Sequence, residues 1–329
     1  VRVRGGLSPI EACRPPHVIV HASRNFAVFS DRFVVVPPRQ VGIAGPRAQE
    51  DFLKVLSVYL SSDFALYQQF FNAPQWGVSM NRANRETLEA IPIPMAQLTD
   101  EECATWLDLH ARLVAASPTQ PSKKTRSKGA PKSSKQMPLP GMAETRSTLS
   151  DLLRELNHRV YEILRLSKSE QILVEDFVQF KRFAIKGKVC EEIAGVPGPV
   201  EMRRYAEVLQ AELDGFFEDN PRLRHRVEIL YDNTSRTGMI DVELLKNSRG
   251  ALQVKVRPID DAASADFQRA QQLARRRRGQ WLYFHRNFRM YEGSRVLLLK
   301  PLERLHWLRS QALLDADTII AETIAGGER

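Results

Sequence analysis

One segment that cannot fold by itself divides this sequence. Residues 117–146 contain five prolines, five serines and almost no large apolar side chains. Seven lysines and arginines stand there against the single acid Glu144, so the segment carries +6 of the chain's net charge of +9. Such a composition buries too little apolar surface to offset the entropy of ordering the chain. The sequence therefore predicts a basic flexible linker at 117–146, with a folded domain on each side of it; 329 residues are enough for two cores.

We expect an α+β protein. Residues 1–116 are predicted to form one domain, because short apolar or alternating runs at 17–21, 26–29 and 33–36 favour a small antiparallel sheet with packed helices. A helical spacer at 147–188 and a second α+β domain at 189–329 are predicted to follow. In that second domain the patterns predict helices at 200–217, 265–277 and 301–324, and strands at 226–230, 239–245, 252–256, 281–284 and 296–299.

The most regular pattern lies in residues 52–71. Apolar side chains recur there at three- and four-residue steps, which predicts one amphipathic helix with a broad buried face. Pro74 disfavours helical geometry at the preceding residue and so ends this helix. Further along, Thr99 and Glu102 have the spacing of a capping box, which predicts another helix through residue 114.

Two motifs in this region carry a family resemblance. An aliphatic helix, Leu53-Lys54-Val55-Leu56-Ser57 through Ser61-Ser62, precedes an aromatic loop and the segment Ala90-Ile91-Pro92-Ile93-Pro94. From Arg24 to Leu113 the chain thereby resembles the distal half of the target-recognition domain in adenine-N6 DNA methyltransferases of restriction-modification and phage-defence systems. The resemblance implies a small sheet that carries the helix, loops presented to the major groove, and double-stranded DNA as the partner.

The expected DNA contacts follow from the side chains present. Asn pairs with adenine and Arg with guanine in the major groove, so we expect the base-reading residues to be Trp76, Arg82, Asn84 and Arg85. The basic linker is expected to follow the phosphate backbone through Lys123, Lys124 and Arg126. Two alternatives stay open: the linker is simply solvated, since no aromatic is interleaved in it, or the chain is a protein-interaction scaffold without salt-dependent DNA affinity.

The catalytic motifs of the resembled family are missing. An adenine-N6 methyltransferase needs a Gly-rich loop for S-adenosylmethionine and an Asn/Asp-Pro-Pro-aromatic motif for the flipped base. Pro15-Pro16 and Pro37-Pro38 both lack the preceding Asn or Asp. We therefore expect this chain alone to hold no cofactor and to catalyse no methylation, with the catalytic domain upstream of Val1 or in a separate subunit. Because the first residue is not Met, we expect a fragment of a longer protein.

A magnesium-dependent nuclease is the alternative for residues 189–329. Asp241 followed by Gln253 and Lys255 resembles a nuclease superfamily built on an Asp and a Glu-or-Gln-x-Lys strand. In that resemblance Asp241 and Gln253 would hold Mg²⁺ while Lys255 orients the attacking water. A meander whose alternate residues are polar explains the same pattern, and a non-catalytic domain is our prediction.

Other features exclude whole classes of protein. Cys13, Cys103 and Cys190 lie far apart without a Cys-x-x-Cys spacing, which argues against a disulfide framework and a structural zinc site. No run approaches 18 apolar residues and no signal-peptide pattern opens the chain, so we expect a cytoplasmic protein without a membrane partner.

Overall fold

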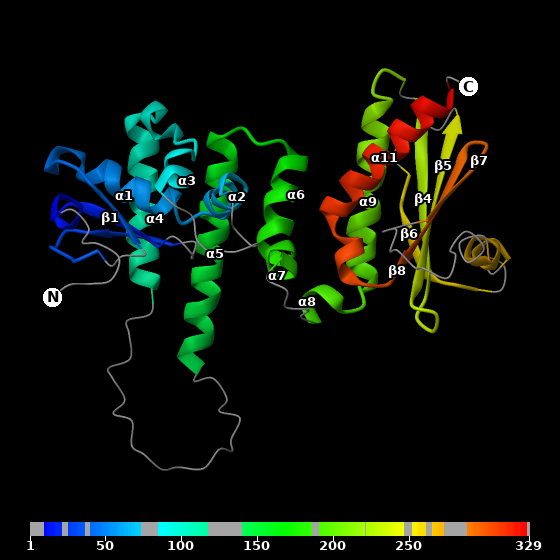
Figure 1. Cartoon of the computed structure of the whole chain (residues 1–329), viewed down its shortest axis with the longest axis horizontal. Helices are drawn as coiled ribbons and strands as arrows, with labels where there is room; N and C mark the ends of the chain where they lie inside the picture. The colour runs from blue at the N-terminus through cyan, green and yellow to red at the C-terminus, as the bar shows by residue number, and fades with distance from the viewer. Residues whose placement is uncertain are drawn as a thin grey trace, which may run out of the picture. The chain divides into compact units, whose positions relative to one another are not determined.

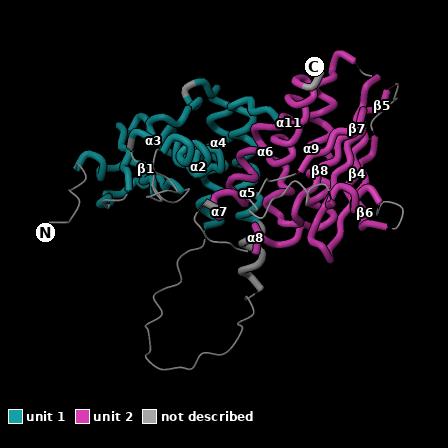
Figure 2. Tube along the Cα trace, turned by 45° about the vertical axis from the view of Figure 1, so that its right-hand side comes forward, with its two compact units in different colours: residues 1–167 teal, residues 168–329 magenta. Residues whose placement is uncertain are grey.

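The computed structural model describes residues 10–21, 26–36, 40–73, 85–117, 140–185, 191–220, 222–246, 252–260, 265–272 and 288–327. The chain divides into two compact units, Val1–Ser167 and Lys168–Arg329, which Figure 2 colours separately. Each unit has a sheet of its own, and the predicted α+β class is confirmed. The boundary lies inside the stretch predicted as a helical spacer, so that spacer is shared between the two units.

The sheet of the first unit has three antiparallel strands in the order β2-β1-β3. The central strand β1 (His17–His21) pairs with β2 (Ala27–Ser30) and with β3 (Gln40–Ala44). A 3-10 turn comes before the sheet in sequence, η1 (Ile10–Cys13), and another comes after it, η2 (Arg47–Gln49). Strand β3 was not predicted. The segment predicted as the third strand, 33–36, is not part of the sheet; its Val34 N donates a hydrogen bond to Cys13 O at 3.3 Å.

The apolar run predicted as one helix forms two. Helix α1 (Glu50–Tyr59) covers one face of the sheet, and α2 (Asp63–Asn72) begins after Ser62 (Figure 1). The Ser62 Oγ accepts a hydrogen bond from Ala65 N at 3.2 Å. A serine cap satisfies a backbone N–H that a helix start leaves open, so it favours a new helix here. The apolar periodicity continues through residues 60–62, so it did not reveal that one helix ends there and another begins.

Helix α3 (Arg85–Glu89) and the turn η3 (Pro94–Gln97) lead to α4 (Asp100–Ala116). The predicted capping box is confirmed: Glu102 N donates to Thr99 Oγ1 at 3.3 Å, and Thr99 N donates to Glu102 Oε2 at 2.8 Å. Helix α5 (Pro140–Ile163) packs against α4 and α2 within the same unit. Residues 140–146, predicted as linker, are thus helical, and segment 118–139 joins two helices of one unit rather than two domains.

The second unit contains a five-stranded mixed sheet in the order β6-β4-β5-β8-β7. Strand β6 runs parallel to β4, and every other neighbouring pair is antiparallel; the strands are β4 (Leu223–Asp232), β5 (Thr237–Lys246), β6 (Lys255–Pro258), β7 (Phe288–Glu292) and β8 (Arg295–Pro301). The remaining elements are helical: α6 (Lys168–Asp176), the π-helical turn η4 (Phe177–Lys181), α7 (Arg182–Ile185), α8 (Glu191–Ala194), α9 (Pro199–Phe216), residues 265–272, η5 (Arg304–Trp307) and α11 (Arg309–Gly327).

Both faces of this sheet carry apolar cores. Helices α9 and α11 cover one face, where Ile229 and Leu298 pack with Leu209 (Figure 1). Leu230 lies in the core of the opposite face together with Phe267 of helix 265–272. Neighbouring residues of a strand point to opposite faces, which is why Ile229 and Leu230 belong to different cores.

Three predictions for this unit need correction. The helix predicted from 301 begins only at Arg309, because strand β8 runs to Pro301 and the turn η5 follows it, with Trp307 buried. The strand predicted at 252–256 begins at Lys255, and β7 was not predicted. The strand predicted at 281–284 lies outside the described residues.

Candidate nucleic-acid interface

Most predicted DNA-binding residues lie outside the part of the chain that the structure describes. Trp76, Arg82 and Asn84 belong to segment 74–84, and Lys123, Lys124 and Arg126 belong to segment 118–139. Arg85 is the first residue of α3, and the placement of its side chain is not described. The structure does describe the helices that precede and follow each segment: α2 and α3 for 74–84, and α4 and α5 for 118–139.

Helix α2 forms the incoming side of segment 74–84. Its last turns carry three aromatic rings: the centroids of Tyr67 and Phe71 are 4.5 Å apart, and those of Phe70 and Phe71 are 5.2 Å apart. Phe71 is 59% exposed, although large apolar side chains are usually covered. An aromatic cluster with one exposed ring, Phe71, therefore precedes the segment that holds Trp76.

The outgoing side is held by a buried tyrosine. The Tyr59 hydroxyl at the end of α1 donates a hydrogen bond to Pro92 O, and burial raises the pKa of Tyr59, so the phenol keeps the proton that it donates. Leu88, Ile91 and Met95 are buried around this point. The Pro92-Ile93-Pro94 segment of the resembled motif is thus tied back to α1.

The two serines after α1 have separate structural roles. Ser61 Oγ accepts a hydrogen bond from Ala27 N at 2.9 Å and lies 2.9 Å from Ser57 O, to which it donates, so it joins the end of α1 to the start of β2. Ser62 caps α2, as described above. In the sequence the two serines interrupt an apolar run, and this polar step is the signal of the helix break.

Segment 118–139 connects helices α4 and α5, which are held together by an ion pair. Arg112 of α4 donates to both carboxylate oxygens of Glu155 on α5, at 2.9 and 2.7 Å, and Arg159 adds a bond to Glu155 at 2.8 Å. The Arg112 hydrogen bonds lower the pKa of Glu155 to about 2, against the opposing effect of burial. The basic segment therefore connects two helices of the first unit that are joined to each other by these hydrogen bonds.

The residues of the nuclease alternative form a different arrangement from the one expected. Asp241 on β5 is 7% exposed, and both of its carboxylate oxygens accept bonds from Arg295, each at 2.7 Å. These hydrogen bonds to Asp241 raise the pKa of Arg295. Lys255 lies on β6, two strands away from Asp241, and Gln253 is exposed and precedes β6.

Between those strands stands Glu228 of β4, in register with both Lys255 and Asp241. Its carboxylate accepts a bond from Arg257 at 2.6 Å. The two adjacent carboxylates are thus each neutralised by an arginine. Within the described ranges, no three His, Cys, Asp or Glu side chains come together as metal ligands would.

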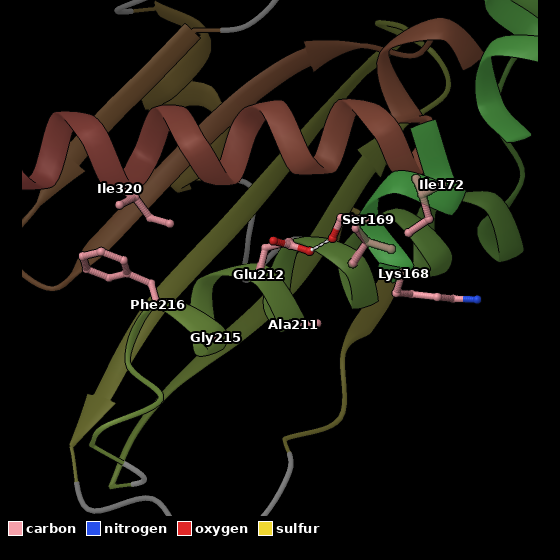
Figure 3. Close-up of a pocket in the computed structure, with 9 residues that line it drawn as sticks. Lys168, Ser169, Ile172, Ala211, Glu212, Gly215, Phe216 and Ile320 are labelled. Atoms are coloured by element: carbon pink, nitrogen blue, oxygen red, sulfur yellow. Dashed lines mark hydrogen bonds between the residues drawn. The ribbon is translucent and has the colours of Figure 1, made fainter. Parts of the chain in front are cut away.

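The second unit also has a pocket of about 460 Å³ between α6, α9 and α11. Figure 3 shows the hydrogen bond of 2.5 Å from Ser169 to Glu212 inside it, with Phe216 and Ile320 at one end. Apart from this bonded pair and Lys168, the lining is apolar. No residue that the sequence singled out as a site lies in the pocket.

The helices of the described segments include none with the length and apolar character to cross a membrane. No model of a known protein family, no curated protein and no solved structure matches this chain.

Proposed function

We propose that the first unit is a DNA target-recognition module of the kind carried by adenine-N6 DNA methyltransferases of restriction-modification or phage-defence systems. The observation that supports this most is the frame around segment 74–84. Helix α2, which precedes this segment in sequence, is capped at its start, and the Pro92-Ile93-Pro94 segment, which follows it, is tied to Tyr59; the residues between include aromatic, amide and guanidinium groups. Binding residues are commonly placed on such segments of rigid scaffolds.

In this proposal Asn84, Arg82 and Arg85 read base edges, with Trp76 beside them, and the lysines of segment 118–139 contact phosphates. That segment connects α4 and α5 and so belongs to the same unit as the base-reading residues. Catalysis and S-adenosylmethionine binding belong to a domain upstream or to a separate cytoplasmic subunit. Calorimetry that detects S-adenosylmethionine binding to this chain would contradict this division of roles.

The test is a titration of the chain against duplex DNA at two salt concentrations. Phosphate contacts release counterions, so the affinity of the wild-type chain should fall steeply with salt. Arg82→Ala combined with Arg85→Ala should weaken binding at low salt. Arg203→Ala combined with Arg204→Ala, which removes the same charge from the exposed face of α9, should not. Unchanged binding by the first variant would contradict the proposal.

A protein-interaction scaffold is the second candidate, and four exposed apolar side chains favour it. Ile10, Val28, Phe33 and Val35 are between 51% and 66% exposed in the first unit. Exposed apolar patches mark interaction sites with proteins as well as other partners. The same titration separates the two candidates, because a scaffold of this kind would show no salt-dependent affinity for DNA.

For the second unit we propose a non-catalytic role. A magnesium nuclease needs carboxylates with free oxygens around one hydrated cation, whereas Arg295 occupies both oxygens of Asp241. Cleavage of DNA that requires Mg²⁺ and is lost in Asp241→Ala would overturn this proposal.

A further inference from the structure

The pocket between α6, α9 and α11 in the second unit has walls that belong to the folded core. Its volume of about 460 Å³ lies within the range of about 300–1,000 Å³ that is usual for ligand pockets. Val208 of α9 and Ile320 of α11 pack against the apolar core, and Ile172 of α6 is buried. Three packed helices thus shape the walls, so the pocket exists before anything binds in it.

Glu212 supplies a negative charge inside this pocket. The Ser169 hydroxyl donates a hydrogen bond to Glu212 Oε1 at 2.5 Å. No other hydrogen bond or ion pair of this carboxylate occurs among the described residues, which leaves Oε2 as an acceptor. Lys168 is the one cation among the described lining residues, and its side chain extends away from Glu212 (Figure 3). The pocket therefore offers a carboxylate oxygen to a cation from outside the chain.

Helix α9 leaves open space in the lining. Gly215 lies in its last turn, and a Cβ at this position would meet no atom within 4 Å. Glycine makes a helix less stable than alanine does, and neither a positive φ nor a close contact among the described residues requires it here. Ala211, one turn earlier, is the other small residue of α9 in the lining. Small residues at these two positions leave room for a ligand on the face of α9 that carries Glu212.

We propose that this pocket binds a small amphipathic amine, whose ammonium group donates to Glu212 and whose apolar part lies along the wall towards Phe216 and Ile320 (Figure 3). A hydrogen bond between an ammonium group and a carboxylate is stronger than one between neutral groups. Glu212 would repel an anionic ligand, and a wholly apolar ligand would take water from the carboxylate without replacing its hydrogen bonds. The exposed ring of Phe216 would be covered by the apolar part.

The test compares three probes with the same apolar chain: octylammonium, octanoate and octanol. Each is titrated into the full chain by calorimetry. We expect octylammonium to bind with a dissociation constant of about 0.1–1 mM, and the other two at least about tenfold more weakly. Because the whole chain carries a net charge of +9, unspecific electrostatic attraction would favour octanoate instead. A preference for the amine must therefore come from a local acid.

Three variants locate the binding site. Glu212→Gln keeps the size of the side chain and removes its charge, so the affinity for octylammonium should fall about tenfold or more. The matched control is Glu207→Gln, which removes the same charge from an exposed position of the same helix and should leave the affinity unchanged. Gly215→Leu fills the open space and should abolish binding, while its melting temperature should not fall, because leucine favours a helix more than glycine does.

Four results would overturn this inference. They are the absence of any octylammonium binding up to about 5 mM, octylammonium binding no more tightly than octanol, equal affinities of Glu212→Gln and Glu207→Gln, and wild-type affinity in a folded Gly215→Leu variant. The inference concerns the second unit alone, so none of these results bears on the DNA-binding role proposed for the first unit.

Discussion

A buried ion pair in the second unit permits a quantitative prediction. Lys300 of β8 is 2% exposed, and its ammonium group donates to Asp315 of α11, to the Tyr205 hydroxyl at 3.0 Å and to His306 O at 3.1 Å. Tyr205 in turn donates to Asp315 Oδ2 at 2.6 Å. All three ammonium protons have acceptors, and the network joins α9, β8, η5 and α11. We infer that this network fixes how the two helices sit on the sheet.

Removing only one charge of the Lys300–Asp315 pair should lower the free energy of unfolding far more than removing both. Asp315→Leu leaves a buried ammonium without a counter-charge, and Lys300→Met leaves a buried carboxylate; each should lower the free energy of unfolding by about 3–5 kcal/mol. The double variant keeps the volume and loses both charges, so its main cost is the unpaired Tyr205 hydroxyl, about 1–3 kcal/mol. The coupling free energy between Lys300 and Asp315 should then be at least about 3 kcal/mol.

The assay is urea unfolding of the wild type, both single variants and the double variant, with the change in midpoint read at constant slope. Tyr205→Phe, which removes only the hydroxyl, serves as a reference for the single hydrogen bond. If the two single effects add to the double effect within about 0.5 kcal/mol, the residues act independently and the reasoning is refuted.

Three further predictions concern single side chains. In Gly238→Ala the new Cβ would lie 2.4 Å from Cζ2 of the buried Trp307 ring, so unfolding should become easier by about 1–3 kcal/mol, and a melting temperature equal to the wild type would contradict this. Gln69→Leu removes a buried amide that has no hydrogen-bond partner among the described residues, so the unfolding midpoint should rise by the equivalent of about 1 kcal/mol or more; a lower midpoint would contradict this. Because the pKa of Glu155 is lowered from 4.5 to about 2 in the folded chain, its stabilising effect should be full above about pH 5 and disappear as the pH falls towards 2. The stability difference between wild type and Glu155→Gln should therefore be larger at pH 7 than at pH 3, and a difference independent of pH would refute this.

Much of the fold could be read from near-neighbour patterns. The capping box of Thr99 and Glu102, the helix at 200–217 and the strands at 226–230 and 239–245 all appear where they were predicted, with boundaries that differ by a few residues. The candidate site stays a prediction: Trp76, Arg82 and Asn84 lie outside the described residues, and only their frame is defined. The apolar run at 302–308 misled the helix prediction, because Trp307 is buried against the sheet from a short turn rather than from a helix.

The sequence by itself determined the helices and strands whose capping or apolar periodicity acts between residues a few positions apart, such as α4, α9, β4 and β5. Tertiary structure alone decided the partners: Arg295 neutralises Asp241 from 54 residues away, Ser169 donates to Glu212 across 43, and α5 returns to α4 so that the basic segment stays within one unit. Strand register and helix packing set these pairs, and both depend on how the whole apolar surface is buried. No local pattern contains that information, which is why the residues that position a site are harder to find than the residues that form its helices.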